Sequence, residues 1–333
     1  MRQLEDYVIE DTSAAKLRVS AEGLKRFQDS PLGLTVHWGL YALSHEAGEW
    51  IYYSNLIPEA EYRKRMDAFN PTRFCAEEWA DLMVEAGMDY LMITSKHHDG
   101  FCLWDTELTD FKSTNTTFGR DILAELATAL QDRGLGLHFY YSLVDWTHPA
   151  YRNDWDAYVA YYQNQLRELL TNYGRIDGVL FDGYWPRQGF EEGAEADYFT
   201  PGGAWDLAGT YDLIHELQPG AMVTNNAHVP LQPGEDYQVF ELDLPGEDTI
   251  GFNTTEFGDW PMATWWNVNS GWSYQPWNHS VKTVDELVAR YTSARASKAS
   301  LFLNVGPRRW GDIHPQEQTI LREFGQRVRE LKL

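Results

Sequence analysis

The chain is poor in cysteine, short of basic residues and free of long apolar runs. Of its 333 residues only Cys75 and Cys102 are cysteines, which are too few for a disulfide framework, and no C-x-x-C spacing indicates a zinc or redox motif. Lys and Arg total 27 against 50 Asp and Glu, so the formal net charge is −23. This acidic excess excludes sequence-independent binding to nucleic acid or to an anionic membrane.

Segments for export or membrane insertion are equally scarce. No run of about 18 apolar residues predicts a membrane span. The opening residues are mixed polar and acidic and do not resemble a signal peptide. We therefore expect a cytoplasmic protein, although a leader removed earlier would leave the same sequence.

Eight short apolar runs spaced along the chain predict β-strands. Several of them are apolar on both faces, which is typical of a parallel sheet covered on both sides. The runs span residues 32–38, 90–96, 135–142, 178–183, 221–226, 237–243, 264–272 and 300–306. Amphipathic stretches with helical spacing lie between many of these runs, and three of the stretches are followed by a glycine that can end a helix.

Eight strands alternating with helices predict a closed (β/α)₈ barrel, formed as a single domain by residues 1–333. A doubly wound sheet is the alternative, but no G-x-G-x-x-G motif follows the first strand. The sixth and seventh units are the least regular part of this pattern, because no clear helix separates them.

Two carboxyl groups stand at predicted strand ends, where the active site of a barrel enzyme lies. Asp182 ends the fourth run and Glu241 follows the apolar part of the sixth. Each also has a structural interpretation, as a turn cap for Asp182 and as a buried salt bridge for Glu241. Together they suit a glycoside hydrolase, which needs one nucleophile and one acid/base. Glu235 and Asp236 remain alternatives for the acid/base.

His97, His98 and Asp99 combine side chains that can bind zinc. Adjacent side chains on an extended chain point in opposite directions, so we expect the two histidines to be poorly placed for one ion. We therefore expect no metal and no cofactor, and we expect the imidazoles to hydrogen-bond to substrate hydroxyl groups. The abundance of aromatic residues, with 14 Trp, 19 Tyr and 15 Phe, fits a sugar substrate, because flat rings stack on the C–H faces of pyranoses.

These motifs together resemble the α-L-fucosidases of glycoside hydrolase family twenty-nine, from residue 32 to about residue 315. YLMITSKHHDGF (90–101) is similar to the family's specific K-H-H-D-G-F signature, and LGLTVHWGLYAL (32–43) to its H-W-G-x-Y segment. IDGVLFDG (176–183) resembles the strand that carries the nucleophile. GEDYQVFELDLPG (234–246) resembles the segment that ends in the acid/base of one branch, and LFLNVGP (301–307) resembles the closing signature.

By this resemblance the chain is a retaining exo-α-L-fucosidase that acts on a fucosylated oligosaccharide or glycoconjugate. Asp182 would be the nucleophile and Glu241 the acid/base. The residues that would hold the fucose are His37, Glu49, Trp50, His97, His98, Tyr140 and Trp272. The family's common C-terminal β-sandwich is expected to be absent. Leu180 stands where many members have Trp, and Ala227 and His228 follow the fifth strand where an Arg is usual.

Three other interpretations remain open. The chain could be a catalytically silent carbohydrate-binding protein, which the presence of both carboxyl groups argues against. It could be a metal-dependent barrel hydrolase, or a glycosidase for a related sugar such as L-galactose. The sequence does not determine the oligomeric state.

Overall fold

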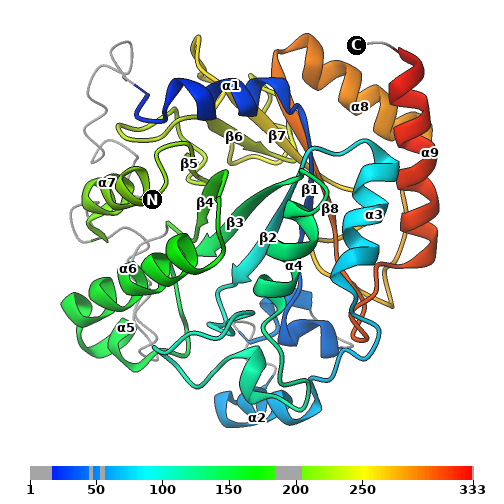
Figure 1. Cartoon of the computed structure of the whole chain (residues 1–333). Helices are drawn as coiled ribbons and strands as arrows, with labels where there is room; N and C mark the ends of the chain where they lie inside the picture. Colours follow the sequence, from blue (N-terminus) through cyan, green and yellow to red (C-terminus); the bar gives the residue numbers. More distant parts are fainter. Residues whose placement is uncertain (1–16, 45–47, 53–56, 185–204, 332–333) are drawn as a thin grey trace.

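Eight parallel strands form a barrel in the computed structural model, which describes residues 17–44, 48–52, 57–184 and 205–331 (Figure 1). The strands are β1 (Leu32–Val36), β2 (Tyr90–Lys96), β3 (Gly136–Ser142), β4 (Gly178–Asp182), β5 (Met222–Asn225), β6 (Gln238–Glu241), β7 (Met262–Asn267) and β8 (Ala299–Val305). They hydrogen-bond in the order β5-β4-β3-β2-β1-β8-β7-β6. The predicted (β/α)₈ barrel is confirmed, and each strand overlaps one of the eight predicted runs.

Helices cover the outside of the barrel and its two ends. They are α1 (Ala21–Asp29), α2 (Glu59–Lys64), α3 (Ala76–Ala86), α4 (Ile122–Gln131), α5 (Pro149–Asn153), α6 (Trp155–Asn172), α7 (Leu207–Leu217), α8 (Val284–Ala296) and α9 (Pro315–Leu331). Short 3₁₀ turns are η3 (Leu40–Leu43), η4 (Gly48–Trp50), η5 (Arg65–Ala68) and η6 (Ser113–Asn115). Both β5–β6 and β6–β7 connections are fully described and contain no helix. The irregularity expected there is therefore real.

Local sequence signals explain several helix ends. The Asp121 carboxylate accepts a hydrogen bond from the backbone of Ala124 and caps α4, and Thr283 with Glu286 forms a capping box at the start of α8. Gly87 ends α3 in the left-handed conformation, at φ 68°, which costs glycine nothing. These contacts orient the helices that cover the strands.

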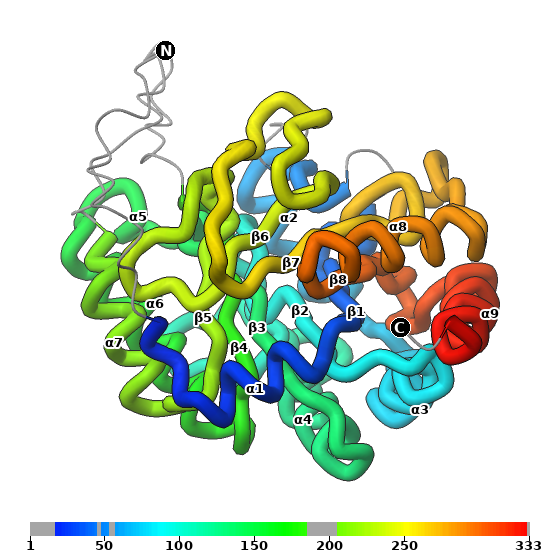
Figure 2. Tube along the Cα trace, turned by 90° about the horizontal axis from the view of Figure 1, so that it is seen from above, coloured from blue at the N-terminus to red at the C-terminus, as the bar shows by residue number. Residues whose placement is uncertain are grey.

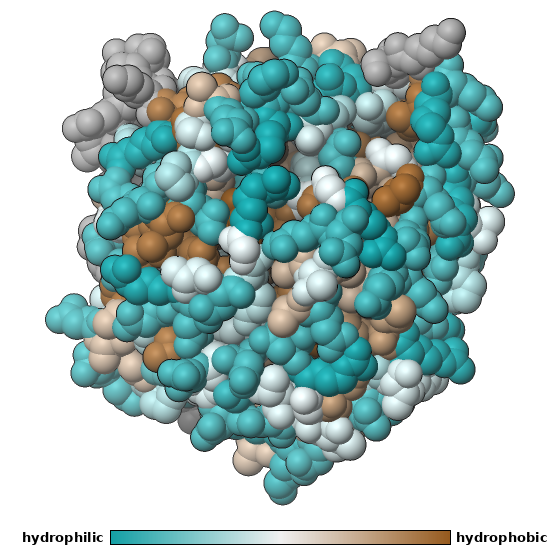
Figure 3. Space-filling model, viewed as in Figure 1, coloured by the Kyte–Doolittle hydropathy of each residue, from teal (hydrophilic) through white to brown (hydrophobic). Residues whose placement is uncertain are grey.

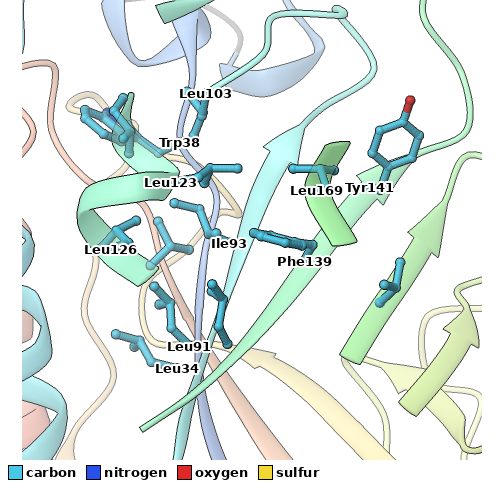
Figure 4. Packing of buried hydrophobic residues seen from close by; sticks show 14 of the residues in the cluster. Leu34, Trp38, Leu91, Ile93, Leu103, Leu123, Leu126, Phe139, Tyr141 and Leu169 are labelled. Atoms are coloured by element: carbon cyan, nitrogen blue, oxygen red, sulfur yellow. The ribbon is translucent and has the colours of Figure 1, made fainter. Parts of the chain in front are cut away.

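The strands separate two apolar layers, because successive side chains of a strand point to opposite faces. Leu91 and Ile93 of β2 face outward and pack with Leu123 and Leu126 of α4 (Figure 4). The side chain between them, Met92, belongs to the cluster that fills the barrel interior. The interior of the barrel is thus a packed core rather than a pore.

Asp236 joins the two strands that share no ladder, β5 and β6. Its backbone N–H donates to the carbonyl of Val223 at 2.7 Å, and its carboxylate accepts from the Val223 N–H at 2.9 Å. The same carboxylate accepts from the N–H groups of Arg18 and Val19 and lies 2.8 Å from Nε2 of His215. A buried carboxylate thus replaces the missing ladder and ties the segment before α1 to the barrel.

The two ends of the barrel are covered differently. Figure 1 shows α1 across one end and α2 at the opposite end. The Ser20 N–H donates to the carbonyl of Pro219, just before β5, so α1 lies where the strands begin. The carboxyl ends of the strands therefore lie on the α2 side.

The outer surface is largely polar. On the face shown in Figure 3, hydrophilic side chains predominate and hydrophobic ones form small separate groups. No helix among the described residues is long and apolar enough to span a membrane.

Candidate active site

A pocket of about 350 Å³ lies at the carboxyl ends of the strands. Its lining consists of His37, Glu49, Trp50, His97, His98, Asp182, His228, Glu241, Phe252, Trp265 and Trp272. Eight of the nine residues predicted for the site are in this lining. The ninth, Tyr140, is buried and reaches the pocket through a hydrogen bond to Asp182. Residues distant in the sequence therefore meet at one place.

Asp182 is the last residue of β4 and is held by donors on two sides. The Tyr140 hydroxyl donates to Oδ2 at 2.6 Å, and the backbone N–H of Gly183 donates to Oδ1 at 2.7 Å. Nε2 of His98 lies 3.6 Å from Oδ2. These contacts fix the orientation of the carboxylate toward the pocket.

Glu241 is the last residue of β6 and lines the same pocket. Asn226 donates from Nδ2 to Oε2 at 2.7 Å, and Nε2 of His228 lies 3.8 Å from the same oxygen. Burial, together with the nearby Asp182 carboxylate, raises the pKa of Glu241 to about 7, against the lowering effect of the Asn226 hydrogen bond. A substantial fraction of Glu241 is therefore protonated at neutral pH.

The other two candidate acids lie elsewhere. Glu235 accepts hydrogen bonds from the Tyr211 hydroxyl and the Gln232 N–H, and burial raises its pKa to about 8. Asp236 lies in the gap between β5 and β6. Neither residue lines the pocket, so Glu241 is the member of this trio that lines it together with Asp182.

His37 and His98 both present Nε2 to the pocket. Nδ1 of His37 lies 2.8 Å from Oδ1 of Asn304. Nδ2 of Asn304 donates to Asn267 and to the carbonyl of Trp272, so its Oδ1 faces the His37 ring. Nδ1 of His98 lies 2.7 Å from the Ser142 hydroxyl, which itself donates to a carbonyl. In both rings the proton is therefore on Nδ1, and Nε2 is an acceptor.

These imidazoles are neutral because they are buried. Burial lowers the pKa of both His37 and His98 to about 4, and it also lowers the pKa of His97. Neutral acceptors of this kind match the hydroxyl donors of a sugar.

Aromatic rings pack against one another at the pocket. His97 stacks on Tyr140 with centroids 5.6 Å apart, and Trp265 and Trp272 lie 4.6 Å apart beside His37. Such rings can cover an apolar face of a sugar, while the histidines bind its hydroxyl groups.

Two expectations about these residues were wrong. His97 and His98 do not point apart: their ring centroids are 4.0 Å apart and both line the pocket. The reason is that β2 ends at Lys96, so the chain is no longer extended. Trp272 is not on a strand, because β7 ends at Asn267. It lies in the following loop, where the neighbouring Ser273 donates to Glu49 from its N–H and its hydroxyl.

Some residues of the site had no assigned role in the sequence analysis. His228 and Phe252 line the pocket from loops, where no strand pattern indicates a direction. Asn304, which orients His37, is part of the LFLNVGP segment, and its interior position would have identified it as a buried polar residue. Leu180 does not line the pocket; it belongs to the cluster inside the barrel.

Among residues 17–44, 48–52, 57–184 and 205–331, no three His, Cys, Asp or Glu side chains are arranged to hold a metal ion.

Comparison with known proteins identifies the family of this chain. The model of the Alpha-L-fucosidase family matches residues 7–330. The chain belongs to this family. It is 32% identical to alpha-L-fucosidase 1 of Arabidopsis thaliana over 280 residues, which are 78% of this chain and 52% of the relative. It is 25% identical to the human plasma alpha-L-fucosidase over 90% of this chain and 66% of the relative. The chain thus spans between half and two thirds of these curated relatives.

Solved fucosidase structures match most of the chain. The alpha-L-fucosidase isoenzyme 1 from Paenibacillus thiaminolyticus superimposes with a TM-score of 0.78 at 32% identity, covering 92% of this chain and 75% of that one. A fucosidase from Bacteroides thetaiotaomicron, trapped as a covalent intermediate with 2-fluoro-fucosyl fluoride, gives a TM-score of 0.80 at 28% identity, covering 94% and 76%. These superpositions show that the chain shares the fold of solved fucosidases.

Proposed function

We propose that this protein is a retaining exo-α-L-fucosidase that removes terminal α-L-fucosyl residues from glycans or glycosides. The observation that carries the proposal is the pair of carboxyl groups from β4 and β6 in one pocket. Asp182 is oriented by two donors, while the pKa of Glu241 is raised to about 7 by burial and by Asp182. An oriented carboxylate beside a partly protonated one is what double displacement needs.

In the first step an oxygen of Asp182 attacks the anomeric carbon as the bond to the leaving oxygen breaks. Glu241 gives its proton to that oxygen, and the fucosyl group is then bound to Asp182. In the second step Glu241 takes a proton from water, which attacks the same carbon and releases Asp182. Two inversions give α-L-fucose. The covalent intermediate trapped in the Bacteroides relative supports this route.

The fucose would lie among the remaining predicted residues. Nε2 acceptors of His37 and His98 would bind its hydroxyl groups, and Trp272 would contact the face that carries the C5 methyl group. Glu49, held by Ser273, and Trp50 close the pocket on the η4 side. The resemblance to the fucosidase family implies these roles, and the presence of these side chains in the pocket with Asp182 supports them.

The experiment is turnover of 4-nitrophenyl α-L-fucoside with product stereochemistry followed by NMR. We expect fucose release with α-L-fucose as the first product. β-L-Fucose as the first product contradicts the retaining mechanism, and absence of turnover of any fucoside supports the silent binding protein. Faster turnover of the matching α-L-galactoside would reassign the sugar.

The same assay distinguishes the proposed fucosidase from a metal-dependent hydrolase. We expect dialysis against a chelator to leave turnover unchanged, because the roles above use only protein side chains. Loss of activity that zinc or manganese restores would favour the metal-dependent hydrolase.

A further inference from the structure

Two pocket residues, His228 and Phe252, lie beside Glu241 on loops that follow β5 and β6. Nε2 of His228 is 3.8 Å from Oε2 of Glu241, and the rings of His228 and Phe252 meet edge to face with centroids 4.5 Å apart. Hydrogen bonds to Asp182 come instead from Tyr140 and Gly183. The pair therefore marks the side of the pocket where the acid/base stands.

Asn253 holds this side in place. Its Nδ2 donates to the carbonyl of Glu241 and to Oδ2 of Asp243, both at 2.8 Å. Because both partners are acceptors, the amide orientation is determined and Oδ1 faces Nδ1 of His228, at 3.1 Å. The proton of a neutral His228 is therefore on Nδ1, and Nε2 is a hydrogen-bond acceptor beside the catalytic carboxyl group.

The backbone of His228 is also constrained. Its φ is 59°, a left-handed value that is uncommon for a residue other than glycine. Its carbonyl accepts from the N–H of Thr254, which ties the β5–β6 loop to the β6–β7 loop. Burial lowers the pKa of His228, so the ring is neutral at neutral pH. The acceptor thus has a defined position before any ligand binds.

Phe252 supplies an apolar surface at the same place. Its side chain lines the pocket while 49% of the residue is exposed. A large ring that is half in water and half in a pocket lined by histidines is suited to stack on the C–H face of a sugar.

We propose that His228 and Phe252 form the leaving-group subsite, and that the group bound there is a pyranose. The sugar ring would lie against Phe252, and the hydroxyl group next to the linkage would donate to Nε2 of His228. This inference rests on the proposed function, because an acid that protonates the glycosidic oxygen must have the leaving group at its side. A leaving group without that hydroxyl would lose the contact with His228.

The test compares two substrates. One is the fucosyl disaccharide that the wild-type protein cleaves fastest, and the other is α-L-fucosyl fluoride, whose leaving group is a single atom. The variants are Phe252→Ala and His228→Asn, since asparagine tolerates a left-handed backbone and is too short to keep the acceptor in place. Phe257→Ala is the matched control, because Phe257 is on the same loop, is 51% exposed and does not line the pocket.

We expect His228→Asn and Phe252→Ala each to lower kcat/KM for the disaccharide by about tenfold or more, consistent with one lost hydrogen bond or stacking contact. The loss for the fluoride should be at least about fivefold smaller. Removing the neighbouring hydroxyl from the disaccharide should lower wild-type kcat/KM by a similar factor and leave His228→Asn with little further loss.

Equal losses on the two substrates, or a Phe252→Ala effect no larger than that of Phe257→Ala, would overturn the subsite and leave the proposed function intact. A wild-type protein that cleaves neither substrate would overturn the proposed function, and the subsite with it.

Discussion

The two sides of the barrel are built differently. From β8 through β1 to β5 the strands pair continuously, and β2 and β3 are seven residues long. On the other side β5 and β6 have four residues each, share no ladder and are followed by loops without a helix. Figure 2 shows the chain beyond β6, in yellow, extending as a long loop. The regular side carries Asp182 and the irregular side carries Glu241.

The two sides of the barrel orient different residues of the site. Asp182 and the histidines after β1 and β2 are oriented by neighbouring strands, whose positions the ladder fixes. Glu241 is oriented by loop residues, Asn226 and Asn253, and the leaving-group pair also lies on loops. Loops tolerate substitution better than ladder strands do. We therefore expect substitutions on the proposed leaving-group side to disturb the barrel less than substitutions in the proposed sugar pocket.

The largest expected effect is on the regular side, at Asp182, the proposed nucleophile. Asp182→Asn should lower turnover by about a thousandfold or more while the fold is retained, because the amide is not a competent nucleophile. Steady-state kinetics and circular dichroism measure the two quantities. Azide should restore turnover by supplying an external nucleophile. Near wild-type turnover in the pure variant would remove Asp182 from this role.

The next effect is on the irregular side, at Glu241, the proposed acid/base. Glu241→Ala should lower kcat/KM for a natural linkage by about 10²–10⁴-fold, and less for an aryl fucoside whose leaving group needs little protonation. Glu235→Gln is the comparison, since Glu235 is a buried acid outside the pocket. A leaving-group dependence in Glu235→Gln and not in Glu241→Ala would mean that Glu241 is the wrong carboxyl group.

The junction of the two sides predicts a loss of stability. Asp236→Ala removes the acceptor for three backbone N–H groups and the partner of His215. We expect the free energy of unfolding to fall by about 3–5 kcal/mol, as measured by urea denaturation. A change below about 1 kcal/mol would show that the β5–β6 gap is closed by other contacts.

The smallest effect is a shift in pH dependence. In the proposed mechanism Glu241 acts as an acid when protonated, so kcat/KM should decline as pH rises through the pKa of about 7. The Asn226 hydrogen bond lowers this pKa, so Asn226→Ala should move the alkaline limb to higher pH. A pH profile on each protein measures the limb. A shift of the alkaline limb to lower pH would contradict the inference that the Asn226 hydrogen bond lowers the pKa of Glu241.

Much of the regular side could be predicted because its signals are local. The apolar runs predicted β2 at its observed bounds and β4 to within one residue, and Asp182 followed as the polar end of a buried strand. The irregular side was harder. The β7 run was placed too late because several tryptophans continue past its end at Asn267, and the loops of His228 and Phe252 have no periodicity that indicates where a side chain points.

The amino-acid sequence predicted the strand count, the barrel and a carboxyl group at the end of β4, because strand periodicity and strand-end polarity are properties of neighbouring residues. It left Glu235, Asp236 and Glu241 as alternatives, since all three are acids within seven residues of one another. Only the tertiary structure separated them: Asp236 replaces a ladder, Glu235 is paired with Tyr211, and Glu241 lines the pocket with Asp182. The protonation of Glu241 depends on burial and on a charge 59 residues away in the chain, and no local pattern records either one.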